Sequence, residues 1–189
     1  GTFSITGCFS FHPLKNLNVW GDGGIITTNS DEMNSKIRLL RNHGLTDRDH
    51  CEVFAYNSRL DTIQAVVANH LLDKIEAITN ARITHASYLD SGLGDVRGIY
   101  IPKRDAGVKE VFHIYSFLAE NRDALWDFLR DNGIDAKIHY PIPMHLQPAA
   151  RYLNYKKGDF PITERVANQT ISLPVHEFVQ LQDLDLMNS

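Results

Sequence analysis

The segment from Asp61 to Ser91 constrains the fold of this chain more than any other part of the sequence. Its apolar residues recur at spacings of three and four, the period of an α-helix with a buried face. The positions that set this period are Ile63, Val66, Val67, His70, Leu71, Lys74, Ile75 and Ile78. Glycines at 92, 94 and 98 and then Pro102 follow. The sequence therefore predicts one long helix, a first domain over 1–91 and a second over 92–189.

Two short strands are expected ahead of this helix. Residues 3–11 are rich in aromatic and β-branched side chains that partly alternate, and residues 23–28 form a second β-branched run. The loop between them contains Pro13 and a single lysine, Lys15. A helix should follow, capped near Asn29 and ending near Gly44. The two strands would therefore present Lys15 at their ends.

The chain after Ser91 predicts a small layered domain. We expect a strand near residues 111–118, a helix from Arg122 to Asn132 that ends at Gly133, and a short strand at residues 134–139. Two further helices are expected at about residues 163–170 and 182–187. The predicted fold class is therefore α/β.

Composition excludes several classes of protein. The 189 residues are 43% hydrophobic and 22% charged, with a net charge of −4, whereas nucleic-acid scaffolds need clustered Lys and Arg. No apolar run approaches the ~18 residues of a membrane span, and no secretory signal is recognisable. We expect a cytoplasmic protein with no nucleic-acid or membrane partner. Cys8 and Cys51 are too few and too far apart for a zinc or CxxC site, so free thiols are expected.

Lys15 is the strongest candidate for a catalytic residue. A loop held between two buried strands can direct an amine into a site instead of into solvent. Partial desolvation there favours the neutral amine, which can form a Schiff base with an aldehyde. Most loop lysines are solvated, however, and the spacing alone leaves that alternative open.

Several motifs occur in a set order along the chain. They are Cys8–Leu17, Trp20–Thr28, Leu40–Gly44, Tyr56–Ala65, His139–Pro148, Lys156–Pro161 and Ile171–Pro174 with His176. This series resembles the DegT/DnrJ/EryC/StrS family of sugar aminotransferases, which use pyridoxal 5′-phosphate (PLP). The resemblance covers essentially the whole chain. It implies an aspartate-aminotransferase-like fold (PLP fold type I), with 1–91 as the end of the large PLP-binding domain and 92–189 as the small C-terminal domain.

The resemblance also implies roles for individual residues. Lys15 occupies the position that carries PLP as a covalent aldimine, and Ser10 matches the hydroxyl that binds the PLP phosphate. Asn57 matches an asparagine that reaches the phosphate of the neighbouring subunit's cofactor, which implies a homodimer with shared active sites. Arg59 could orient the Asn57 loop or contact an anion, and a surface ion pair with Asp61 explains it equally well.

Three histidines fall in segments that by resemblance contact the substrate: His12, His139 and His145. The last two lie six residues apart among three prolines, which favour a stiff loop at the rim of a cleft. Six residues do not align on one helical face and no third ligand is close, so no metal site is expected. For each histidine, a packed structural role stays open.

The resemblance implies transfer of an amino group from an amino acid, by analogy glutamate, to a keto group of a nucleotide-linked deoxysugar. Such reactions serve amino-sugar, cell-surface polysaccharide or glycoside biosynthesis. Relatives carry a ring-stacking aromatic, a Gly-Thr phosphate loop and an aspartate at the pyridine nitrogen on a segment ahead of Gly1. We therefore expect a carboxy-terminal portion that is inactive alone. A non-catalytic regulatory remnant and an unrelated α/β enzyme that uses Cys8 or a histidine are the alternatives.

Overall fold

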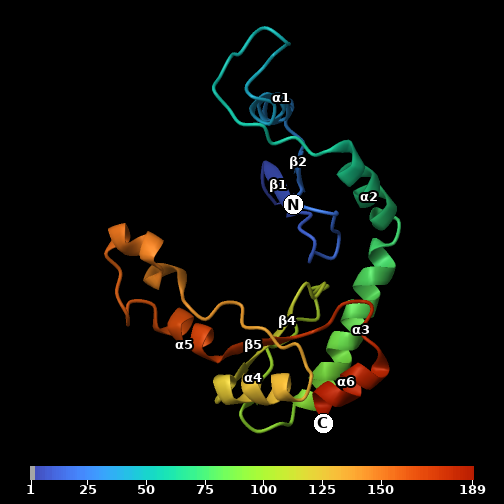
Figure 1. The fold of residues 1–189 in the computed structure, drawn as a ribbon, viewed down its shortest axis with the longest axis vertical. Helices are drawn as coiled ribbons and strands as arrows, with labels where there is room; N and C mark the ends of the chain where they lie inside the picture. Colours follow the sequence, from blue (N-terminus) through green and yellow to red (C-terminus); the bar gives the residue numbers. More distant parts are fainter. Residues whose placement is uncertain (1–2) are drawn as a thin grey trace. The chain divides into compact units, whose positions relative to one another are not determined.

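The computed structural model describes residues 3–189, and the chain forms two compact units, Gly1–Glu76 and Ala77–Ser189 (Figure 1). The division between these units lies ahead of the domain boundary expected near Ser91. That boundary stays a prediction for the whole protein. Each unit has its own apolar cluster.

The first unit is built on an antiparallel hairpin, as the two β-branched runs predict. β1 (Thr6–Ser10) pairs with β2 (Gly24–Thr28), and the register places Ser10 opposite Gly24. α1 (Asp31–Leu40) follows, and the Ser30 side chain accepts a hydrogen bond from the Met33 amide at its start. The first strand begins later than expected because its opening residues are not paired with β2.

The predicted single helix from Asp61 to Ser91 is wrong, because the segment contains two helices. α2 (Thr62–Leu72) ends at Leu72, and α3 (Ile75–Leu93) begins three residues later. The Lys74 amide donates to the Leu71 carbonyl at 3.0 Å, a bond of the tighter 3₁₀ type. The apolar period passes through this break, since the spacing of side chains records which residues are apolar and not where the hydrogen bonding of the helix is interrupted.

The second unit is a three-stranded antiparallel sheet in the order β3–β4–β5. The central strand β4 (Tyr115–Ala119) pairs with β3 (Ile99–Tyr100) on one side and with β5 (Thr170–Leu173) on the other. Helices α3, α4 (Arg122–Asp131) and α6 (Leu181–Asn188) contribute side chains to the core over this sheet. The chain also forms α5 (Pro161–Gln169) and two 3₁₀ helices, η1 (Met144–Leu146) and η2 (Pro148–Leu153).

Two strand predictions for the second unit are corrected. The expected strand at 134–139 does not form, since Lys137 alone exchanges backbone hydrogen bonds with Ser172, at 3.0 and 2.8 Å. Neither β3 nor β5 was predicted, and the first residue of β5 was assigned to the preceding helix. All four residues of β5 are buried. A strand buried on both faces lacks the period of two that reveals half-buried strands.

Two buried arginines tie helices of the second unit to neighbouring segments of the chain. Arg122 of α4 is buried, and its Nη1 donates to the carbonyl oxygens of Ala167 and Thr170, both at 3.1 Å. The guanidinium thereby satisfies carbonyls at the C-terminal end of α5. Arg82 of α3 is also buried and donates to the Phe112 carbonyl and to the Glu177 carboxylate.

The hydroxyl of Tyr115, at the start of β4, lies in a polar network against α3. It donates to Asp90 Oδ1 at 2.8 Å, and Arg104 donates to both oxygens of the same carboxylate at 3.1 Å. Burial, and then the bond to Asp90, raises the pKa of the Tyr115 phenol. The phenol therefore stays protonated and keeps its donor at every ordinary pH.

Candidate active site

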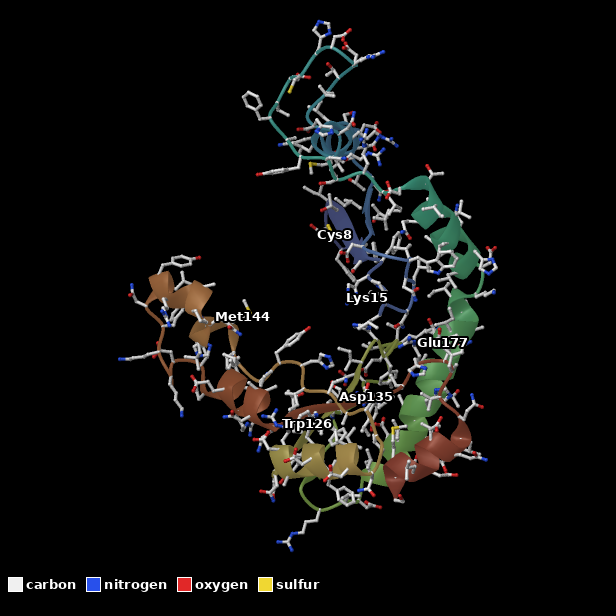
Figure 2. All side chains as sticks on the ribbon, in the orientation of Figure 1. Cys8, Lys15, Trp126, Asp135, Met144 and Glu177 are labelled. Atoms are coloured by element: carbon white, nitrogen blue, oxygen red, sulfur yellow. The ribbon has the colours of Figure 1, made fainter. Side chains whose placement is uncertain are left out.

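Lys15 lies in the loop between β1 and β2, as the sequence predicts (Figure 2). The expectation that both strands are buried is wrong for this structure, because most residues of β1 and β2 are exposed. The loop is closed at its base, where the Phe11 amide donates to the Gly23 carbonyl at 2.8 Å and the Val19 amide to the Phe11 carbonyl at 2.9 Å. Phe11 and Val19 are buried in one cluster with Ala68 of α2. The loop is therefore fixed at both ends against the apolar core of the first unit.

Ser10, His12 and Lys15 belong to one turn of this loop. Ser10 Oγ accepts from the His12 amide at 3.2 Å, and the His12 carbonyl accepts from the Lys15 amide at 2.8 Å. His12 Nδ1 accepts from the Leu14 amide at 3.2 Å, which leaves Nε2–H as the donor of the ring. The turn thus places a hydroxyl, an imidazole N–H and an amine within a few residues of each other.

Gln64 of α2 holds the end of this loop, a role that sequence reasoning missed. Its Oε1 accepts from the Trp20 amide at 2.8 Å, and its Nε2 donates to the Trp20 carbonyl at 2.9 Å. Gly21 follows with a positive φ of 152°, and a Cβ there would lie 3.3 Å from Gln64 Nε2. No local pattern could reveal this pair, because the two residues are 44 positions apart.

Asn57 also lies in the first unit, and Arg59 orients its side chain. Asn57 Oδ1 accepts from the Arg59 amide at 3.3 Å and from Arg59 Nε at 3.1 Å. Arg59 Nη1 donates in turn to Asn42 Oδ1 at 3.2 Å. Of the uses considered for Arg59, the structure shows the one that orients the Asn57 loop. The side-chain donor of Asn57 is Nδ2, so this group could donate to an anion while Oδ1 accepts from Arg59.

His139 lines a groove of about 520 Å³ in the second unit. One wall is the irregular segment 139–147 and the other is α5, which contributes Thr163, Val166 and Ala167. His139 Nδ1 lies 3.3 Å from Ser172 Oγ of β5. The lining combines prolines and aliphatic side chains with a few polar groups, as small-molecule sites do.

His145 follows Met144, the residue of η1 that lines the groove (Figure 2), but it is not itself part of the lining. Its side chain is only 8% exposed, and Nε2 lies 3.1 Å from Glu164 Oε1 of α5. Hydrogen bonds from the Gly158 amide and then from His145 lower the pKa of the Glu164 carboxyl. The expected substrate contact at His145 therefore remains a prediction, whereas its packing against α5 is observed.

Within residues 3–189, no group of three or more His, Cys, Asp or Glu side chains is arranged to hold a metal ion. Cys8 and Cys51 are exposed free thiols. In the part of the chain that the structure describes, no helix combines the length and the apolar character that a bilayer crossing requires.

The model of the DegT/DnrJ/EryC1/StrS aminotransferase family matches residues 1–187. The chain belongs to this family. It is 38% identical over 179 residues to the pleiotropic regulatory protein of Geobacillus stearothermophilus, across 93% of this chain and 48% of that protein. It is 37% identical over 175 residues to the dTDP-3-amino-3,4,6-trideoxy-α-D-glucose transaminase of Streptomyces venezuelae, across 93% and 46%.

The aspartate-aminotransferase-like fold class is confirmed by solved members of the DegT/DnrJ/EryC1/StrS family. S. venezuelae DesV in complex with a ketimine intermediate superposes with a TM-score of 0.92 at 34% identity, over 97% of this chain and 50% of that one. The chain spans about half the length of the curated relatives it matches. The contact of Glu164 with His145, like that of Gln64 with Trp20, was missed by sequence reasoning because its two partners lie apart in the sequence.

Proposed function

We propose that the protein to which this chain belongs is a PLP-dependent aminotransferase. It would move an amino group from an amino acid, glutamate by family analogy, to a keto group of a nucleotide-linked deoxysugar. Family membership supports this, as does the relative from Streptomyces venezuelae, whose name describes a dTDP-sugar transaminase. The observation that carries the proposal is the single turn that joins Ser10, His12 and Lys15.

The donor groups of the first unit fit PLP, the cofactor that this family uses. Ser10 Oγ accepts from the His12 amide and so retains its own proton for a phosphate oxygen. Lys15 supplies the amine that an aldehyde requires. When bound, PLP would supply an electron sink for the loss of a proton from the α-carbon of the amino donor.

Lys15 Nζ would hold the cofactor covalently and, once displaced by the amino donor, would act as the general base. It would take the proton from the α-carbon of the donor and return it to the carbon that the cofactor's aldehyde group supplies. Closure of the loop at Phe11, Gly23 and Val19 would keep the amine within reach of both carbons. His12 Nε2–H would be available as a donor to the substrate.

We further propose that Asn57 Nδ2 donates to the cofactor phosphate of a neighbouring subunit. Arg59 donates to Asn57 Oδ1 through its amide and its Nε, and these bonds hold the side-chain amide of Asn57 in one orientation. This arrangement would require a homodimer with shared active sites. His139, which lines the groove of the second unit, would contact the sugar nucleotide, and the protein would act in the cytoplasm.

A regulatory, non-catalytic role is the second candidate. It is favoured by the name of one relative, the pleiotropic regulatory protein of Geobacillus stearothermophilus, at 38% identity. That role would need ligand binding without turnover, and therefore without any requirement for the amine of Lys15.

Borohydride trapping separates the two functions. The full-length protein is incubated with PLP, reduced and digested, and the modified peptide is identified by mass spectrometry. We expect the label on Lys15, together with amino transfer from glutamate to a 3-keto sugar nucleotide. Lys36→Ala, which removes an exposed lysine of α1, should retain both properties. Absence of label and of turnover in the unmodified protein would exclude the aminotransferase.

A further inference from the structure

The groove of the second unit has two walls that are far apart in sequence. The segment 139–147 supplies His139, Tyr140, Met144 and Gln147 among others, and α5 supplies the opposite side. Tyr140 and Met144 are strongly exposed, at 73% and 77%. Exposed side chains of this kind do not fix the position of their own segment, so another contact must hold the walls at a defined separation.

His145 and Glu164 link the two walls directly. His145 lies on η1 beside the groove-lining Met144, and Glu164 lies on α5 next to the groove-lining Thr163. Their side chains meet at 3.1 Å between Nε2 and Oε1, and they are 8% and 12% exposed. Neither is part of the lining. The pair therefore joins the walls from behind the surface that a ligand would touch.

The segment 155–160 closes over this pair. Glu164 Oε1 accepts from the Gly158 amide at 2.7 Å and from the Phe160 amide at 3.4 Å, in addition to its contact with His145. The Phe160 ring lies 4.8 Å from the His145 ring and 5.0 Å from the Tyr155 ring, centroid to centroid. Water has little access to a pair covered in this way. Removal of Glu164 would leave the covered His145 ring without this partner, and removal of His145 would leave the carboxylate with the two backbone amides alone.

We propose that His145 and Glu164 are positioning residues, which hold the walls of the groove at the separation that binds a sugar nucleotide and do not themselves touch it. This inference rests on the proposed function for the class of ligand. It assigns His145 an indirect role in place of the direct substrate contact that the family resemblance implies.

Steady-state kinetics of the full-length protein tests the proposal with His145→Ala, Glu164→Ala and the double variant. We expect each to raise KM for the sugar nucleotide about tenfold, with kcat and the KM for glutamate within about twofold of the unmodified protein. Because both variants remove one shared contact, the double variant should be no worse than either single one. Arg165→Gln, which removes a charge from an exposed position on the same helix, should leave all three constants unchanged.

Conservative variants separate positioning from loss of the fold. In His145→Gln a side-chain amide can still donate to Glu164, and Glu164→Gln retains an oxygen that accepts from the Gly158 amide. Both should recover most of the lost affinity and keep a cooperative unfolding transition. If His145→Ala weakens binding while Glu164→Ala does not, His145 is a direct contact and the proposal is overturned. Unchanged KM values in all variants overturn it as well.

Equilibrium binding of dTDP and UDP distinguishes this inference from the proposed function. Relatives of the chain are named for dTDP-linked and UDP-linked sugars. Suppose that the unmodified protein binds either nucleotide but transfers no amino group, and that the alanine variants bind it about tenfold less well. That result would support the positioning role and exclude the proposed aminotransferase activity. If neither nucleotide binds, or the variants bind as well as the unmodified protein, the positioning role falls.

Discussion

The Lys15 loop and the 139–147 segment are both positioned in part by a side chain of a helix, but the two contacts differ in kind. Both carry candidate site residues. Gln64 of α2 binds the backbone of Trp20 through two neutral hydrogen bonds. Glu164 of α5 instead holds His145 through a side-chain contact beneath the covering segment 155–160.

The difference between a backbone contact and a side-chain contact determines which substitutions each region can tolerate. A clamp on backbone atoms keeps working with any residue except proline at position 20, so it fixes the path of the loop and does not depend on the side chain there. A clamp between two side chains requires both residue types, and its loss leaves a covered polar group without its partner. We expect the Lys15 loop to be sensitive mainly at Lys15 itself, and the groove to be sensitive at residues behind its surface.

The largest effect should follow Lys15→Ala in the full-length protein. Loss of the amine that would move the proton should reduce amino transfer by about 1,000-fold or more. The unfolding midpoint should change little, because the loop is fixed by backbone bonds at Phe11, Val19 and Gly23. Initial rates with Lys36→Ala as control check this. Near-normal activity in Lys15→Ala would show that this loop is not the catalytic one.

Arg122→Met should produce the largest loss of stability in the second unit. It leaves the buried carbonyls of Ala167 and Thr170, at the end of the groove wall α5, without their shared donor. We expect the free energy of unfolding to fall by about 2–4 kcal/mol, measured by urea denaturation. Arg97→Met, at an exposed position, should change it by less than about 0.5 kcal/mol. Equal effects of the two substitutions would contradict the assignment.

Gln64→Ala should have a smaller effect, confined to the Lys15 loop. Loss of two exposed neutral bonds should destabilise the loop by about 1 kcal/mol and increase amide hydrogen exchange at Trp20. Gln64→Glu keeps an acceptor for the Trp20 amide but lacks the donor for its carbonyl, so an intermediate exchange rate is expected. Exchange at Ile171 of β5, in the other unit, serves as an internal reference. An unaltered rate at Trp20 would mean that the clamp does not restrain the loop.

The smallest effect should be a pH dependence of stability from Glu164. Its pKa is lowered in the folded protein by the Gly158 amide and then by His145, so its contribution is present above the unfolded pKa of about 4.3. That contribution should be lost as the pH falls from there through the folded pKa. Urea denaturation between pH 3 and 6 should show a shallower acid decline for Glu164→Gln than for the unmodified protein. Parallel curves would argue against an ionised Glu164 in this contact.

Sequence reasoning succeeded where the signal is local. The loop that bears Lys15 lies between two strands, and α1, α4, α5 and α6 form close to their predicted positions. Caps, glycines and side-chain spacing act over a few residues and can be read along the chain. The ordered motifs identified the family, which the match over residues 1–187 confirms.

What sequence by itself determined is therefore the family, the α/β class and the residue types that would do the chemistry. Only the tertiary structure determined which other residues hold those chemical side chains in place. The break between α2 and α3, the buried strand β5, the Gln64 clamp and the His145–Glu164 contact each depend on groups that the linear pattern does not bring together. Hydrogen bonds between residues distant in sequence form only after folding has brought the two groups within bonding distance, and a one-dimensional pattern does not record that distance.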